Sequence, residues 1–273
     1  MPWESDVEVP IADLAPTPAE TIITVKDVTM AFGSFVVMRD LDFSIKRGEV
    51  FVVMGGSGCG KSTLLKHLIG LLEPAKGEIF YGEQNFTRSD EESRASILRG
   101  VGVLYQTGAL WSSMTLAENI SLALEQYTDL TAPQVREVAS LKLALVGLGG
   151  FEDYFPSEIS GGMQKRAGLA RAMALDPSVL CIDEPSAGLD PISSKRLDDL
   201  IIELKESLGT TFVVVTHELQ SIFDIATNSV FLDPVSRTMI AQGNPRELRD
   251  HSEDPRVRQF LLREADANGG QTG

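Results

Sequence analysis

Short apolar runs recur along the chain, and helix-like patterns separate most of them. The runs lie at 50–54, 77–81, 101–105, 179–183, 211–216 and 229–233. Strands that alternate with helices in this way are typical of an α/β domain with a mainly parallel sheet. Shorter apolar stretches at 22–25, 28–30 and 35–38 predict an N-terminal β region, antiparallel in our interpretation, that leads into the strand at 50–54.

A long middle segment, from about 107 to 177, lacks the strand pattern. Thr115 with Glu118 three residues later fits a capping box at the start of a helix, and a second helix is predicted from Thr131 to about residue 146. We therefore interpret 107–177 as an α-helical subdomain inserted into the α/β core.

The two ends of the chain differ from the region between them. Residues 1–20 hold five acidic side chains, four prolines and no Lys or Arg, which indicates a flexible acidic arm. Beyond 243, Asn244-Pro245 and Asp254-Pro255 each place a capping residue before a proline and predict two short helices. The predicted organisation is an arm at 1–20, an α/β domain at 21–243 and a helical extension and tail at 244–273.

Composition limits the classes of function. The formal net charge of -15 argues against a nucleic-acid partner, which would reward clustered Lys and Arg. No apolar run reaches the roughly 18 residues of a membrane span, so any membrane role requires a partner. Two isolated cysteines and an N-terminus without an export pattern favour a reducing cytoplasm.

The segment Gly55-Gly-Ser-Gly-Cys-Gly-Lys61-Ser62 fits G-x-x-x-x-G-K-[ST] between a predicted strand and a predicted helix at 63–72. Glycines let such a loop present its N–H groups to phosphate, while the lysine reaches the β/γ-phosphates and the hydroxyl ligates Mg²⁺. Cys59 is either a small residue at a variable position or a thiolate of low pKa near Lys61. The residues predicted to bind the phosphates are Gly55, Gly56, Ser57, Gly58, Cys59, Gly60, Lys61, Ser62 and Thr63.

Two further motifs complete a phosphate-transfer pattern. The apolar run at 179–183 ends in Asp183 and Glu184, at the strand edge where α/β sheets bind ligands. Asp183 can hold Mg²⁺ and Glu184 can polarise the attacking water. Ser160-Gly161-Gly162 opens a predicted helix, where an N-cap and exposed N–H groups form a second anion site.

These motifs, with Gln106, the segment Ser186-Ala-Gly-Leu-Asp190 and His217, occur in an order that resembles the nucleotide-binding subunit of ATP-binding cassette (ABC) transporters. The resemblance covers about 21–243. It implies a P-loop NTPase fold with a mainly parallel sheet, ATP and Mg²⁺ as cofactors, and ATP hydrolysis coupled to transport. It also implies catalytic roles for Glu184, His217 and Gln106.

The remaining roles come from the same resemblance. Phe32 matches the aromatic residue that stacks on adenine, and a phenylalanine in the core is the alternative. Gln106 joins Ser62 and Asp183 around Mg²⁺, while Asp190 communicates between two nucleotide sites. The signature reads Ile159-Ser-Gly-Gly-Met163 where the common form is Leu-Ser-Gly-Gly-Gln, so a polar side chain is missing near the γ-phosphate.

The family mechanism implies partners. Two copies pair head to tail and trap ATP between Lys61 of one and Ser160 of the other. A separate integral membrane permease is implied, and Trp111 and Met114 lie where the family docks a permease helix. The alternative is that both side chains pack within the helical subdomain.

Within the family, the chain is similar to Mla-type ATPases of Mce-associated lipid transporters. The features are Gln106-Thr-Gly-Ala-Leu110, Met163, Gly188-Leu-Asp190-Pro-Ile192 and the tail from Asp254 to Leu261. This implies phospholipid cargo, the cytoplasmic face of the bacterial inner membrane, an accessory small cytoplasmic subunit and a periplasmic Mce-domain protein. An ATPase for a solute importer, such as one for amino acids, and a soluble non-transport ABC protein are the alternatives.

The tail carries an apolar stripe at Val257, Phe260 and Leu261, with spacing i, i+3 and i+4. We expect this stripe to contact a second copy or an accessory subunit, and packing on its own domain is the alternative.

Overall fold

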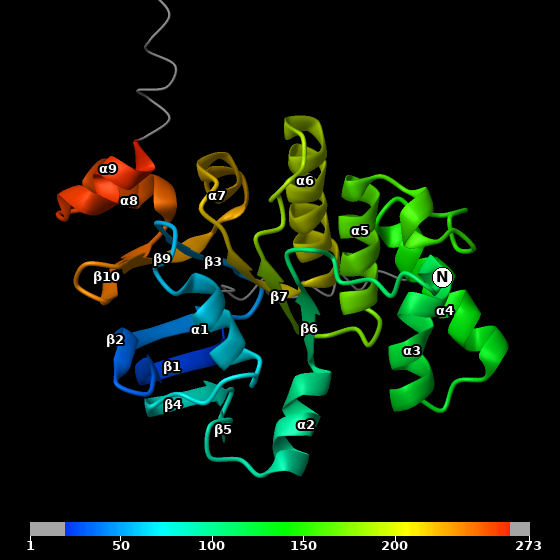
Figure 1. The fold of residues 1–273 in the computed structure, drawn as a ribbon, viewed down its shortest axis with the longest axis horizontal. Coiled ribbons are helices and arrows are strands. Elements are labelled where there is room, and N and C mark those ends of the chain that lie inside the picture. Colours follow the sequence, from blue (N-terminus) through cyan, green and yellow to red (C-terminus); the bar gives the residue numbers. More distant parts are fainter. Residues whose placement is uncertain (1–19, 263–273) are drawn as a thin grey trace, which may run out of the picture.

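A six-stranded sheet forms the centre of the computed structural model, which describes residues 20–262 (Figure 1). The strand order is β10-β9-β3-β8-β7-β6, and every neighbouring pair is parallel except β10 with β9. The mainly parallel sheet expected from the apolar runs is therefore confirmed. Its strands are β3 (Val50–Gly55), β6 (Val101–Leu104), β7 (Val179–Asp183), β8 (Thr211–Val215), β9 (Asn228–Asp233) and β10 (Thr238–Gly243).

A second sheet is antiparallel, in the order β2-β1-β4-β5. The stretches 22–25 and 28–30 belong to one strand, whose register shifts around Asp27, a residue with φ of 50°. The run at 77–81, which the pattern groups with the parallel strands, pairs antiparallel with β1 instead. Only Ile79 of that run is buried, whereas strands of the parallel sheet are buried along most of their length. The strands are β1 (Thr21–Phe32), β2 (Phe35–Lys46), β4 (Lys76–Tyr81) and β5 (Gln84–Asn85).

Helix α1 (Lys61–Leu68) lies between the two sheets. Its side chains Leu64, Leu65 and Leu68 join one apolar cluster with residues of β1, β2, β3 and β8. The helix is shorter than the predicted 63–72 because the chain turns at Gly70, which has φ of 74°. Burial between the two sheets fixes α1, and with it the loop that precedes it.

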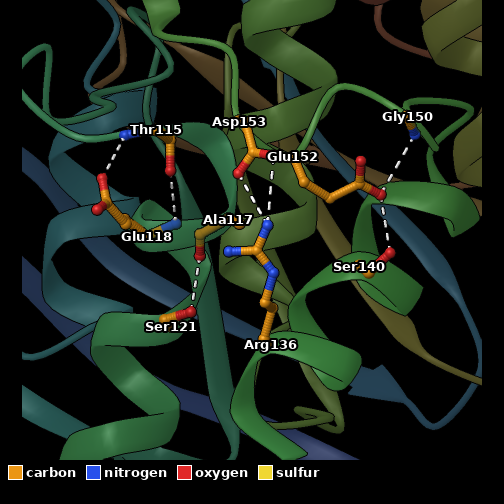
Figure 2. A network of polar contacts seen from close by, with 9 residues as sticks. All are labelled: Thr115, Ala117, Glu118, Ser121, Arg136, Ser140, Gly150, Glu152 and Asp153. Carbon is orange, nitrogen blue, oxygen red and sulfur yellow. Dashed lines mark hydrogen bonds and ion pairs between the residues drawn. The ribbon is translucent and has the colours of Figure 1, made fainter. Parts of the chain in front are cut away.

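The chain between β6 and β7 is helical, and within the described residues it contains no strand. The Thr115 capping box is present: the Thr115 N–H donates to Glu118 Oε2 at 2.7 Å, and the Glu118 N–H donates to Thr115 Oγ1 at 3.2 Å. Figure 2 shows this box beside the Arg136–Asp153 and Ser140–Glu152 contacts that join α4 to the 150–153 turn. The helical elements here are α3 (Leu116–Tyr127), α4 (Ala132–Leu145), the 3-10 turn η1 (Pro156–Glu158) and α5 (Gly161–Ala172).

The two helices predicted beyond 243 are α8 (Pro245–His251) and α9 (Pro255–Leu261). The expectation that the apolar stripe contacts a second copy or an accessory subunit is wrong. Val257, Phe260 and Leu261 are buried in the chain's own core, where the Phe260 ring meets Phe231 edge-on with centroids 5.1 Å apart. The remaining helices are α2 (Glu91–Arg99), α6 (Pro191–Leu208) and α7 (Leu219–Ile225).

Within the described range 20–262, none of the helices is both long and apolar enough to cross a membrane. The acidic arm predicted at 1–20 lies outside the described residues except for Glu20, which pairs with Arg47 at 3.0 Å. Most of the predicted tail beyond α9 lies outside them as well.

Candidate active site

A polar hollow of about 380 Å³ opens where β3, β7 and β8 end, at their carboxyl edge. Parallel sheets bind ligands at this edge because loops from several strands converge there. The phosphate loop, Gln106, the end of β7 and His217 are four segments that lie far apart in the sequence. Most of the residues that the motifs select from these four segments meet in this hollow. It is lined by Val37, Ser57, Gly58, Gly60, Lys61, Ser62, Thr63, Gln106, Glu184 and His217.

The loop between β3 and α1 forms one wall. Gly55 has φ of 147°, and a Cβ there would lie 2.4 Å from the Leu232 carbonyl oxygen, so only glycine fits. The buried Lys61 donates to the carbonyl oxygens of Gly55 and Gly56, both at 3.1 Å. Gly60, the N-cap of α1, has no side chain, and no other side chain of the described residues caps this first turn, which leaves its N–H groups and positive dipole end for an anion.

Cys59 points away from the hollow. Its side chain is buried, and burial raises the pKa of its thiol above the ordinary value. A raised pKa is the opposite of what the thiolate of low pKa considered from the sequence would require. Cys59, Gly55 and Gly56 contribute to the loop's shape without lining the hollow.

A hydroxyl and a carboxylate meet in a way that suits Mg²⁺. Ser62 Oγ donates to Asp183 Oδ1 at 2.8 Å, and burial raises the pKa of Asp183. The described residues contain no group of three or more His, Cys, Asp or Glu side chains arranged to hold a metal ion by themselves. Mg²⁺ commonly uses one or two protein oxygens together with phosphate and water, so Ser62, Asp183 and the nearby Gln106 amide fit this ion.

Glu184 and His217 form a pair at the back of the hollow, where Glu184 Oε1 lies 2.9 Å from His217 Nδ1. The other carboxylate oxygen, Oε2, is buried and has no hydrogen-bond partner among residues 20–262, so it can accept from a water. Glu184 has φ of 47°, a strained conformation for a residue other than glycine. An oriented, partly unsatisfied carboxylate has the properties of a general base.

Phe32 lies at the end of β1, outside the lining of the hollow. Its side chain is 56% exposed, so the alternative that it belongs to the core is wrong. It pairs in register with Phe35 across the β1–β2 turn, and Val37 of β2 reaches the hollow. Phe32 therefore presents an exposed aromatic face beside the phosphate loop.

The motif at Ser160 and the loop at Asp190 meet each other and not the hollow. Ser160 is the N-cap of α5 and accepts from the Met163 N–H at 3.3 Å, while Asp190 is the N-cap of α6. A Cβ on Gly162 would lie 3.2 Å from Ser193, in the first turn of α6. Ser160, Gly161 and Asp190 are exposed and Gly162 is partly buried, and together these residues form a group separate from the hollow.

A second hollow, of about 550 Å³ and more apolar, lies between α2, β6, α3 and α5. Trp111 lines it and is 60% exposed, so the alternative that this side chain simply packs within the helical segment is wrong. Met114 is partly buried and lines a different depression beside α3.

Sequence reasoning missed Lys165, which is buried beside the hollow and binds the Gln106 carbonyl oxygen. A single lysine within a helix gives no signal of that contact. Val37 was missed for a similar reason, because it lies in a strand that belongs to the other sheet.

Comparison with known proteins identifies relatives of this arrangement. The family model described as ABC transporter matches residues 38–187. The intermembrane phospholipid transport system ATP-binding protein MlaF of Haemophilus influenzae is 37% identical over 247 residues, which cover 90% of this chain and 92% of MlaF. The probable ribonucleotide transport ATP-binding protein mkl of Mycobacterium tuberculosis is 41% identical over 244 residues, or 89% of this chain and 67% of mkl.

Two solved structures share the fold. The cbiO1 subunit of an ABC transporter complex from Clostridium perfringens superposes with a TM-score of 0.78 at 26% identity and covers 92% of this chain and 98% of its own. A dimeric ATP-binding cassette bound to ADP and Pi gives 0.73 at 27% identity, with 82% and 98% covered. The site geometry, the family match and these relatives agree, and the chain belongs to the ABC transporter family.

Proposed function

We propose that this chain is the ATP-hydrolysing subunit of an ABC system that moves phospholipid or a related lipid across the bacterial envelope. The observation that carries the ATPase part is the single hollow that joins Lys61, the Ser62–Asp183 contact and the Glu184–His217 pair. Support for the lipid part is the MlaF relative, whose name states phospholipid transport and which aligns over nearly its whole length.

In the proposed mechanism the loop at 55–63 cradles the phosphates with its N–H groups, and Lys61 neutralises their charge. Ser62, Asp183 and Gln106 hold Mg²⁺, which supplies charge stabilisation to the phosphates when bound. Glu184 accepts a hydrogen bond from the attacking water through its free Oε2, while His217 fixes the carboxylate through Oε1. Phe32 offers its exposed ring to adenine.

The group at Ser160, Gly161, Gly162 and Asp190 completes the site of a second copy. It is exposed and lies outside its own hollow, so a phosphate held by Lys61 of one chain reaches this group only across a dimer interface. A related cassette 27% identical to this chain is described as dimeric with ADP and Pi. In this head-to-tail homodimer the two chains close on each other only when ATP lies between them.

The apolar hollow at Trp111 suits an amphipathic helix of an integral membrane permease. Leu98, Leu122 and Tyr127 also line this hollow. Trp111 comes directly after the Gln106 loop in the sequence. A helix seated there would move when that loop moves. We infer an ATPase domain that begins at 21 and includes α9 beyond residue 243, because α9 packs in the same core. Its helical part, 107–177, supplies most of this docking surface, and the permease holds the chain at the cytoplasmic face of the inner membrane.

An accessory small cytoplasmic subunit and a periplasmic Mce-domain protein belong to the same proposal. They rest on the likeness to Mla-type ATPases, and no described surface of this chain is assigned to either.

The ATPase assignment is tested with Glu184→Gln. This variant should bind ATP with unchanged affinity but turn over at least about a hundredfold more slowly, because the amide cannot deprotonate or polarise water as a carboxylate does. Phosphate release and binding of a fluorescent ATP analogue measure the two effects. Near-normal turnover would exclude the assignment of Glu184.

The cargo is tested by purifying the tagged chain from bacterial membranes in mild detergent. Recovery of a permease and an Mce-domain protein with bound phospholipid, detected by lipid mass spectrometry, supports lipid transport. A soluble periplasmic binding component would instead support a solute importer, for which the name of mkl, with ribonucleotide as cargo, is the specific indication.

A further inference from the structure

Two residues other than glycine adopt a left-handed backbone next to the candidate active site. Ala109, three residues after Gln106, has φ of 49°, and Glu184 has φ of 47°. Such conformations persist only where the surroundings fix them, and they cluster at functional sites. In both cases a cationic side chain of the same helix, α5, binds the carbonyl oxygen of the strained residue.

Lys165 of α5 is the first of these side chains. It is only 6% exposed, and its ammonium donates to the carbonyl oxygen of Gln106 and, at 3.4 Å, to that of Glu184. Within the described range 20–262, no carboxylate lies within ion-pair distance of it. Burial lowers the pKa of Lys165, although Asp183 and Glu184 favour its charged form. A buried cation placed on two main-chain oxygens is expensive unless it serves a specific arrangement.

Arg171 is the second, six residues further along α5. Its guanidinium donates to the carbonyl oxygen of Ala109 and, at 3.2 Å, to that of Gly108. Burial lowers the pKa of Arg171, as expected for a half-buried cation that binds neutral carbonyls. The two cations therefore hold the 106–109 loop at both of its ends.

Gly168 lies midway between them in sequence and marks the closest approach of the loop to the helix. A Cβ at Gly168 would lie 3.0 Å from the Gly108 carbonyl oxygen and 2.8 Å from the Leu104 side chain. The positions 165, 168 and 171 are spaced by three, so they fall along one side of the helix. The absence of a side chain at the middle position lets the loop lie directly on α5.

We infer that Lys165, Gly168 and Arg171 are positioning residues that fix the Gln106 loop and the Glu184 backbone to α5. The loop, the end of β7 and the helix that begins at Ser160 then behave as one body. This inference rests on the proposed roles of Gln106 and Glu184. The consequence concerns the nucleotide held by a second copy. When that nucleotide contacts Ser160, α5 transmits the resulting displacement to Gln106 and Glu184 of the same chain.

The test compares Lys165→Met and Lys165→Arg in the full chain. The methionine variant keeps the length of the side chain but removes the donor. It should lower kcat for MgATP about 10- to 100-fold and change KM by no more than about threefold, because misplacement of catalytic groups affects turnover more than binding. Lys165→Arg should restore most of the turnover.

Hydrogen exchange provides the readout that a merely structural role would not give. In Lys165→Met the amides of 105–110 should exchange about tenfold faster, while those of α5 remain unchanged. The matched control is Arg166→Met, on the same helix, whose side chain binds the carbonyl oxygens of Val146 and Gly147, away from the hollow. It should leave turnover and the exchange of 105–110 within about twofold of the parent chain.

Three results would overturn the inference: normal turnover in Lys165→Met, loss of turnover that Lys165→Arg does not restore, or faster exchange throughout α5. Glu184→Gln, measured in parallel, separates this failure from failure of the proposed function. If Glu184→Gln is inactive and Lys165→Met is normal, only the positioning role is wrong. If Glu184→Gln is active, the assignment of Glu184 is wrong, and the exchange data still test the contact.

Discussion

The N-termini of α1 and α5 have the same positive dipole end but different surroundings. At α1 the N-cap is Gly60, left-handed with φ of 91°. The first turn faces the polar hollow, and within residues 20–262 no side chain caps it. At α5 the Ser160 side chain caps the Met163 N–H, and the turn is exposed outside that hollow. One anion site is therefore complete within the chain, whereas the other lacks its ligand until a second molecule supplies it.

The largest effect is expected at the α1 end. Lys61→Ala should weaken ATP binding about 10- to 100-fold, because a charge-assisted hydrogen bond to phosphate is worth about 1.5–3 kcal/mol. Isothermal titration with ATP measures this effect. Lys66→Ala, an exposed lysine on the same helix, is the control and should bind nearly normally. Equal losses in both variants would mean that general charge, and not the loop, holds the phosphate.

A change at the α5 end should act on association alone. In the Glu184→Gln background, Ser160→Arg should abolish ATP-dependent dimers, because a bulky cation occupies the surface that meets the partner's nucleotide. Light scattering with and without ATP reports the dimer, and monomer affinity for ATP should stay within about threefold. A dimer that persists would show that α5 is not part of the interface.

A smaller effect is expected at the adenine side of the α1 site. Phe32→Ala should weaken ATP binding about tenfold, since base–aromatic stacking is worth about 1–3 kcal/mol. Binding of inorganic tripolyphosphate, which has no base, should not change. Phe35→Ala is the matched control: Phe35 is 57% exposed, but its ring lies under the Arg237 guanidinium at 5.0 Å. If both variants lose affinity for ATP equally, the Phe32 and Phe35 rings both contact the adenine base.

The smallest effect on nucleotide binding is expected from Asp198, which lies on α6 on the side that packs against α7. Burial raises the pKa of Asp198 to about 6. Its Oδ2 accepts from Ser221 at 2.8 Å, whereas Oδ1 has no hydrogen-bond partner in the described part of the chain. The folded state thus holds this proton more tightly than the unfolded state, so ionisation destabilises the fold increasingly as pH rises from about 4 to 6 and fully above that range.

Asp198→Asn should therefore raise the free energy of unfolding by about 1–3 kcal/mol at pH 8. At pH 5 the same substitution should stabilise the fold by about 1 kcal/mol less than it does at pH 8. Urea unfolding at the two pH values measures this difference, and turnover at pH 8 should hardly change. A gain that is the same at both pH values would contradict the assigned ionisation.

Much of the fold could be predicted from the chain because its strands are short, apolar and well separated. The limits of β7 agree with the predicted run, since every residue before Asp183 is buried. The second half of β2 was missed although Leu41, Phe43 and Ile45 alternate with polar residues, a period of two that predicts a strand with one buried face. The alternation does not continue from Met38, because both Arg39 and Asp40 lie between two buried positions and Asp40 has φ of 53°.

The sequence predicts which residues form the candidate site, but it does not predict how their side chains are arranged. The motifs select Lys61, Asp183, Glu184 and His217, and the structure brings them together. The stripe at Val257 failed as an interface prediction because spacing alone cannot say which apolar surface covers a helix. The contacts of Lys165 and Arg171 could not be predicted either, since they bind main-chain oxygens, whose positions depend on tertiary structure.

The terminal helices have a consequence for shortening this chain. Arg256 of α9 binds the buried Asp233 at 2.6 Å, and the neighbouring Leu232 carbonyl oxygen is the atom that leaves no room for a side chain at Gly55. Removing everything after Gly243 would uncover Phe231 and leave the Asp233 carboxylate without its cation, directly behind the phosphate loop. A minimal nucleotide-binding unit cut from this protein should therefore end after α9 and not at the last strand.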